Sequence, residues 1–261
     1  MENLIQGITV ALVGTAGVVA LQWPRLQAQT TTQAIDPAAA TAAHALQAEQ
    51  LSLRKLLPSF GFGNLIADWT FLEFVQYFGD TPVREVTDYS LSGDFFQVVV
   101  DQDPFFMDAY LFLATATSFY AAQPETTVNL LSEGLKAMTP ALPPDAYLLW
   151  RYKALDELLL LGEGQAAQQS FSQAADWAEQ SPLPNASKAA ETSRNTANFL
   201  KQDPDSAQAQ VSAWFQVWSG AVNEEVQKLA ADRIKALGFE IVIENDAVQL
   251  IPLAKGASNG E

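Results

Sequence analysis

The apolar positions of this chain form a series of segments with helical spacing, separated by short turns that contain Pro or Gly. The first segment, residues 4–23, is predominantly apolar and carries no charged side chain. From about residue 44 onward, apolar side chains recur every three to four positions, which predicts amphipathic helices. Residues 239–244 and 247–251 are rich in β-branched side chains on either side of a turn, which predicts a short β-hairpin. The pattern therefore predicts an all-α protein with helical hairpin repeats and a small C-terminal β-hairpin.

The first apolar segment has the length of a membrane-spanning helix. Twenty helical residues rise about 30 Å, which is close to the thickness of the hydrocarbon core of a bilayer. Trp23 and Arg25 follow at once, as an interfacial aromatic and a cation at the headgroups would. We therefore expect residues 1–25 to form one N-terminal transmembrane helix that anchors the chain. A cleaved signal peptide and a buried helix are the alternatives, although Met1 to Asn3 supply no positive charge of the kind that opens a signal peptide.

The rest of the chain divides by composition. Residues 26–43 are rich in Gln, Thr and Ala without apolar periodicity and are expected to be a linker. A helical body is predicted over 44–238, the β-hairpin over 239–253 and a disordered polar tail over 254–261. The last helix of the body, over Glu224 to Leu237, is amphipathic, so the β-hairpin is expected to pack on it or to complete a partner's sheet.

One helix of the body is apolar on nearly every side. It is expected between Asn64 and Gly79, and it carries only two acidic residues, Asp68 and Glu73. A helix that is apolar all round needs cover on every face. Two interpretations follow: a central core helix, or a surface that docks onto a membrane or a membrane-embedded partner.

Two segments in the middle of the chain echo each other. Asp108-Ala109-Tyr110 opens one apolar helix pattern, and Asp145-Ala146-Tyr147 opens another about 37 residues later. A second helical stretch follows each of them. We expect two antiparallel helical hairpins, because small residues at helical spacing let the two helices approach closely.

The second hairpin contains the run Gly164-x-x-Ala167-x-x-x-Phe171-x-x-Ala174, closed by Pro182. This run resembles the second helix of a tetratricopeptide repeat (TPR), and the segment from Pro104 to Ala114 resembles the entry to another repeat. The closing prolines come late and the first hairpin has no Gly in its turn, so the units are degenerate. The resemblance covers about residues 80–200. It implies a TPR-like stack of hairpins that binds other proteins, and its motif contains no catalytic residue.

The whole plan is also similar to membrane-anchored tetratricopeptide proteins of bacteria, in which an Asp-Trp-rich helix like residues 67–79 precedes the repeats. That resemblance implies protein–protein interaction in the assembly or maintenance of membrane complexes. It also implies an extracytoplasmic body, whereas the single cation Arg25 favours the opposite orientation. The alternative is a constitutive accessory subunit of a large membrane complex. The candidate partner-binding residues are Asp68, Trp69, Glu73, Tyr77, Tyr110, Tyr147 and Trp150.

Charge and composition limit the ligands and reactions that we expect for this chain. The formal net charge is −16 and the pI about 4.3, so we expect no binding to nucleic acid, which requires clustered cations. The chain has no Cys and a single His, His44. Familiar zinc sites and nucleophile–base pairs need more than this. We therefore expect no metal, no cofactor and no enzymatic activity, with protein partners and a membrane contact through residues 4–23.

Overall fold

The computed structural model describes residues 35–202, 204–244 and 247–253. The chain divides into two compact units, Met1–Ala40 and Thr41–Glu261, and only six residues of the first are described. The predicted anchor, residues 26–34 of the predicted linker and the polar tail from 254 lie outside the described residues. No helix within the described part of the chain is long and apolar enough to cross a membrane.

The described residues are mostly helical and end in a two-stranded antiparallel hairpin, as the apolar pattern predicts. The helices are α2 (Pro37–Leu56), α3 (Gly63–Gly79), α4 (Thr81–Thr87), α5 (Ser92–Gln102), α6 (Met107–Thr115), the π-helix η1 (Ala116–Tyr120), α7 (Pro124–Ala137), α8 (Tyr147–Leu159), α9 (Gly164–Glu179), α10 (Ala186–Leu200), α11 (Ala207–Gly220) and α12 (Glu224–Ala236). The strands are β1 (Phe239–Glu244) and β2 (Ala247–Pro252).

Helix α2 begins earlier than expected. The sequence predicted a linker up to residue 43, but the helix starts at Pro37. The Asp36 carboxylate accepts a hydrogen bond from the Ala38 N–H at 3.0 Å, and Pro37 occupies the first turn, where its missing N–H costs nothing. The segment that follows is rich in Ala, which favours helix without leaving any apolar periodicity.

Two helical stretches are interrupted in the structure. Helices α4 and α5 are separated at Asp88, whose φ is +69° and whose carboxylate accepts the Ser90 N–H at 2.7 Å. Helix α6 changes to the π-helix η1 at Ala116. Neither interruption involves Gly or Pro, so the usual sequence signals for a break are missing.

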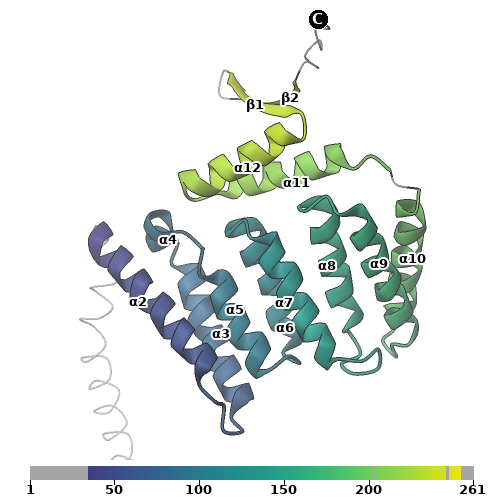
Figure 1. Cartoon of the computed structure of the whole chain (residues 1–261), viewed down its shortest axis with the longest axis horizontal. Coiled ribbons are helices and arrows are strands. Elements are labelled where there is room, and N and C mark those ends of the chain that lie inside the picture. Colours follow the sequence, from purple (N-terminus) through teal and green to yellow (C-terminus); the bar gives the residue numbers. More distant parts are fainter. Residues whose placement is uncertain (1–34, 203, 245–246, 254–261) are drawn as a thin grey trace, which may run out of the picture. The chain divides into compact units, whose positions relative to one another are not determined.

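The helices of the second unit pack side by side in chain order (Figure 1). Helix α3 packs on α5, α5 on α7, α7 on α8, α8 on α9 and α9 on α10. Helix α11 crosses the ends of this row and contacts α8 and η1, and α12 packs on α11. The two hairpins that open at Asp108 and Asp145 thus lie in the middle of one continuous helical layer.

The core between α3 and α5 is built from aromatic rings. Phe74 is 1% exposed, and its ring centroid lies 4.4 Å from that of Phe96 and 5.9 Å from that of Phe95. A second core forms around Trp214 on α11, whose indole N–H donates to the Leu160 carbonyl at 3.1 Å. This bond satisfies the polar end of a fully buried Trp and joins α11 to the end of α8.

The C-terminal hairpin packs on the last helices rather than standing free. Its register pairs Phe239 with Pro252 and Ile241 with Leu250. Phe239, Ile241 and Leu250 pack against the core around Trp214, and β1 contacts α12. Burial of one face supplies the stability that an isolated two-stranded hairpin lacks.

Close packing of α6 on α7 makes a testable prediction. A Cβ on Gly134 would lie 2.0 Å from the Tyr110 hydroxyl, which donates to the Pro104 carbonyl at 2.9 Å. Gly134→Ala must displace the buried ring and break that bond, so we expect a loss of about 1–3 kcal/mol of unfolding free energy. Gly164→Ala, where a Cβ meets nothing within 4 Å, is the matched control and should leave the melting temperature unchanged or slightly higher. Equal melting temperatures for the two variants would contradict this packing.

Candidate docking surface

Helix α3 is apolar on two opposite faces. Ala67, Thr70, Phe74 and Tyr77 are buried against the rest of the protein. Leu65, Trp69 and Leu72, at positions i, i+4 and i+7, are 65%, 60% and 56% exposed. We call these three residues the α3 outer stripe. Helix α3 therefore combines the two interpretations of its sequence. One side is part of the core, and the other side is an uncovered apolar surface.

The turn before α3 continues this surface. Leu56, Leu57, Phe60 and Phe62, which we call the α2–α3 tip, are all exposed. Phe60 and Gly61 both have positive φ, +49° and +87°, and the Phe62 N–H donates to the Ser59 carbonyl at 2.8 Å. This is the pattern of a type I′ turn, in which only a residue such as Gly is free of strain. The turn holds Phe60 at 83% exposure.

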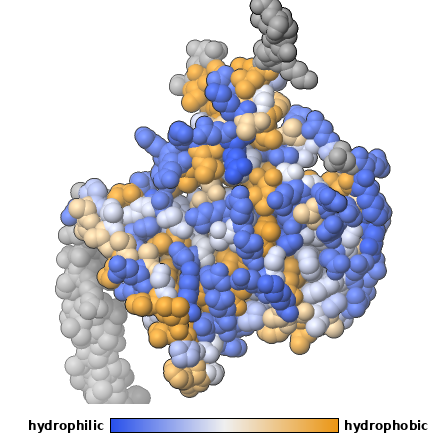
Figure 2. All heavy atoms as spheres, viewed as in Figure 1, coloured by the Kyte–Doolittle hydropathy of each residue, from blue (hydrophilic) through white to orange (hydrophobic). Residues whose placement is uncertain are grey.

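An open apolar groove of about 490 Å³ lies between the tip and the stripe. Figure 2 shows hydrophobic residues gathered over the lower ends of α2 and α3, where this groove lies. Most of its lining is made of aliphatic and aromatic side chains. The lining residues are Arg54, Leu57, Pro58, Phe60, Leu65, Ile66, Trp69 and Thr70. Monomeric proteins seldom leave an apolar surface of this kind uncovered unless it binds something.

The polar groups beside the groove are already paired. Arg54 forms a bidentate ion pair with Glu73, and its guanidinium also donates to the Thr70 hydroxyl at 3.2 Å. The Trp69 indole N–H donates to the same Glu73 carboxylate at 2.6 Å. Lys55 forms an ion pair with Asp94. The edge of the groove therefore has little net charge, and its free binding capacity is apolar.

The structure distributes the seven candidate residues between surface and core. Trp69 lines the groove and is exposed, and the half-buried Glu73 accepts its indole N–H. Asp68 is exposed elsewhere on α3, and Trp150 is half-buried on α8. The three tyrosines, in contrast, are core residues: Tyr77, Tyr110 and Tyr147 are at most 6% exposed. Their rings pack within the helical layer and offer no surface to a partner.

Tyr77 shows how these rings are held. Its hydroxyl donates to the Asp88 carbonyl and accepts the Leu91 N–H, each at 3.2 Å, and the Arg84 guanidinium lies 3.9 Å from its ring centroid. Burial raises the pKa of Tyr77 to about 12. The residue thus ties α3 to the α4–α5 turn, which is a structural task.

The candidates include no residue of the α2–α3 tip and only Trp69 of the α3 outer stripe; Phe60 and Phe62 are the aromatic residues among those missed. A signal was present, because Phe60-Gly61-Phe62-Gly63 sits between two helices with no charged residue from Leu56 to Ala67. Apolar turn residues between amphipathic helices are unusual, since turns normally carry polar side chains.

A buried polar network lies away from this surface. The Asp156 carboxyl on α8 is hydrogen-bonded to the Ser118 hydroxyl of η1, which lies 2.8 Å from the Thr127 hydroxyl of α7. All three residues are buried, and burial raises the pKa of Asp156 to about 7. When Asp156 is protonated it can donate to Ser118, which then donates to Thr127; when it is ionised the order reverses. The network joins three helices and is sealed from solvent.

The neighbouring acid, Glu157, faces a different helix. It accepts a hydrogen bond from Lys153 at 2.6 Å, and the same ammonium donates to the Ser170 hydroxyl of α9 at 3.1 Å. Asp156 and Glu157 therefore hold opposite neighbours of α8, as adjacent helical positions must.

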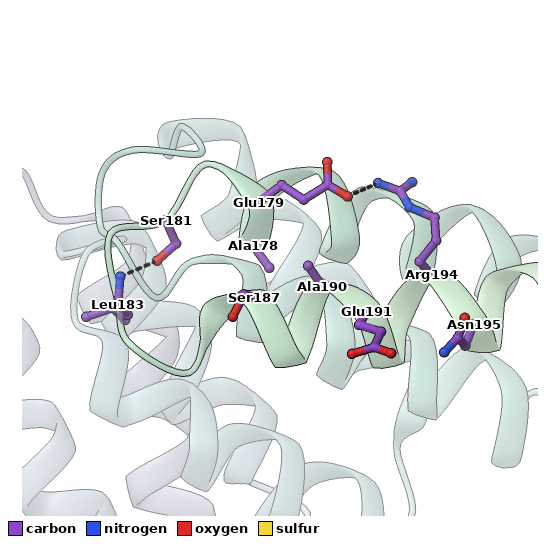
Figure 3. Close-up of a pocket in the computed structure, with 9 residues that line it drawn as sticks. All are labelled: Ala178, Glu179, Ser181, Leu183, Ser187, Ala190, Glu191, Arg194 and Asn195. Atoms are coloured by element: carbon purple, nitrogen blue, oxygen red, sulfur yellow. Dashed lines mark hydrogen bonds and ion pairs between the residues drawn. The ribbon is translucent and has the colours of Figure 1, made fainter.

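A shallower depression of about 430 Å³ lies between α9 and α10 (Figure 3). Arg194 bridges two carboxylates there, Asp176 and Glu179, each at 2.7 Å. The Ser181 hydroxyl accepts the Leu183 N–H at 3.3 Å. These groups satisfy one another, so the depression has weaker binding chemistry than the α2–α3 groove.

The Asp156 network makes a prediction about pH. The folded protein keeps a proton on Asp156 up to about pH 7, whereas the unfolded chain releases it near pH 4. The contribution of this bound proton to the free energy of unfolding is therefore complete below pH 4, and it is lost as the pH rises through 7. Between pH 5 and 8, wild type should lose roughly 2–3 kcal/mol more than Asp156→Asn, measured by chemical denaturation.

Asp108→Asn, at an exposed position of α6, is the control and should keep the wild-type pH profile. An Asp156→Asn profile that matches wild type would show that Asp156 is ionised in the folded protein.

We compared the chain with known proteins and found no relative. No protein-family model, curated protein or solved structure matches this chain. Within the described ranges, no group of three or more His, Asp or Glu side chains could hold a metal ion. The α2–α3 surface is thus the feature with the clearest binding chemistry in the described part of the chain.

Proposed function

We propose that this protein is a membrane-tethered helical scaffold that binds a protein partner through the α2–α3 surface, in the assembly or maintenance of a membrane complex. One observation carries the proposal. The α3 outer stripe leaves Leu65, Trp69 and Leu72 exposed beside an apolar groove of about 490 Å³. In the proposal, residues 4–23 hold the chain in the bilayer and the helical body lies on the extracytoplasmic side.

The spacing of the stripe favours a helical partner. Anchors at i, i+4 and i+7 are those by which helices pack into apolar grooves. The stripe is flanked by the paired Arg54 and Glu73, so a partner helix need not bring a compensating charge. Covering a large apolar side chain contributes about 1.5–3 kcal/mol, and Trp is enriched among the residues that dominate binding.

The TPR-like hairpins support a role in holding proteins together. Tyr110 on α6 packs over Gly134 on α7, and Ala167, Phe171 and Ala174 of α9 are buried in the α8–α10 layer. Tyr110 and the three α9 residues are among the positions on which the tetratricopeptide resemblance rests. Stacked hairpins of this kind give a rigid frame from which a binding surface can be presented.

The alternative is a constitutive accessory subunit whose α2–α3 surface is covered permanently. The same exposed stripe supports it, because permanent interfaces are the more apolar ones. The two proposals differ in the isolated protein. A scaffold that binds reversibly should be monodisperse in mild detergent without its partner, whereas a permanent subunit should self-associate through the uncovered stripe.

Affinity purification of full-length variants from detergent-solubilised membranes tests the proposal. Trp69→Ser combined with Leu72→Ser should remove at least nine-tenths of the co-purifying polypeptides, because it removes two apolar anchors while leaving the buried face of α3 intact.

Phe199→Ser is the matched control, since Phe199 is a similarly exposed aromatic, 57% exposed, on α10. Its co-purifying set should equal that of wild type. A set that survives the α3 double substitution, in a protein whose melting temperature is unchanged, would overturn the proposal.

A further inference from the structure

We propose that the α2–α3 tip enters the interface of a lipid bilayer. The inference deepens the proposed function and rests on it in one respect, which is that the chain is tethered to a membrane. It assigns the two parts of the surface to different neighbours: the α3 outer stripe to a protein and the tip to lipid.

The composition of the tip favours lipid. Twelve consecutive residues, from Leu56 to Ala67, contain no charged side chain. The most exposed large apolar residues of the described chain lie here, with Phe60 at 83% and Leu56 at 81%. Phe and Leu at the end of a narrow turn offer little area for shape-matched packing against a protein, but they partition readily into the interface of a bilayer.

Two backbone hydrogen bonds within the tip reduce the number of its polar groups that need water. The Phe62 N–H donates to the Ser59 carbonyl at 2.8 Å, and the Leu57 N–H donates to the Arg54 carbonyl at 3.3 Å. Internal hydrogen bonds lower the cost of moving a turn toward hydrocarbon, where an unpaired backbone group is unfavourable. The positive φ of Phe60 is strained for a residue with a side chain, and such strain is typical of residues held for a function.

The residues behind the tip follow the order of a membrane interface. Arg54 and Lys55 lie on the last turn of α2. Basic side chains occupy the headgroup region when an apolar segment lies deeper. Both cations are paired with carboxylates, Glu73 and Asp94, and the chain carries a net charge of −16. The geometry therefore points to zwitterionic lipid rather than to an anionic surface.

The length of the tether permits this contact. Residues 24–36 separate the apolar segment from α2, and thirteen extended residues reach about 45 Å. Helix α2 has 20 residues and is therefore about 30 Å long. A chain of this length is longer than α2, so a bilayer that held residues 4–23 would be within reach of the far end of α2.

The absence of Cys from the sequence makes a direct test possible. Full-length Phe60→Cys and the control Phe199→Cys are labelled with an environment-sensitive fluorophore and placed in phosphatidylcholine nanodiscs. We expect the label at residue 60 to shift to the blue and to lose at least half of its intensity when lipids with nitroxide-labelled chains are included. The label at residue 199 should change by less than a tenth, and salt should change neither result.

Three outcomes would overturn the inference: a label at residue 60 that stays in water, a shift equal to that at residue 199, or a shift that requires an added protein. Label at Ser59→Cys, in the same turn, repeats the measurement without removing an aromatic ring. If the label at residue 60 stays in water, the co-purification result for Trp69→Ser with Leu72→Ser is unaffected. The lipid contact of the tip and the protein contact of the stripe are therefore tested independently.

Discussion

The structure depends on burying only one side of α3. Phe74 and Tyr77 on that side assemble the aromatic core with Phe95 and Phe96 of α5. Dispersion and loss of apolar hydration there hold the first helices of the row together. The opposite side is almost as apolar, and the described part of the chain leaves it uncovered. This uncovered apolar face of α3 is the observation on which the proposed binding of a partner rests.

The polar contacts of the molecule are arranged to leave that surface free of competing charge. Arg54 and Lys55 are neutralised by acids on α3 and α5. On α8, Asp156 is hydrogen-bonded to Ser118 and one oxygen of Glu157 is paired with Lys153, while Glu157 Oε2 is buried without a hydrogen-bond partner. Buried polar contacts of this kind fix how helices align, and they contribute more to specificity than to net stability. The row is thereby a rigid support for the α2–α3 surface.

Much of the fold could be predicted from the spacing of apolar residues. The apolar helix before residue 79, the hairpins around Tyr110 and Tyr147 and the C-terminal strands all follow from it. The start of α2 could not, because an Ala-rich segment is helical without being periodic. The break at Asp88 could not either, since it depends on a carboxylate that bonds its own backbone and on contacts distant in sequence.

The candidate site was predicted less completely, for a physical reason. The pattern of α3 shows that all its faces are apolar, but which face stays exposed depends on where α2, α5 and α6 pack. Trp69 was a candidate and is exposed, whereas Tyr77, eight residues later, is buried. Tyr110 and Tyr147 stand at repeat entries and Tyr77 in the aromatic helix before them, and such positions serve packing as readily as binding. The tip was visible in the sequence as a charge-free turn whose meaning required the structure.

The central claim is that the outer face of α3 is covered in its native setting. Hydroxyl-radical footprinting of intact membranes, compared with the purified protein in detergent, measures this directly. The account predicts that Trp69 and Leu72 are oxidised at least fivefold more slowly in membranes, while Phe199 reacts equally in both. Equal oxidation of Trp69 in the two preparations would contradict it.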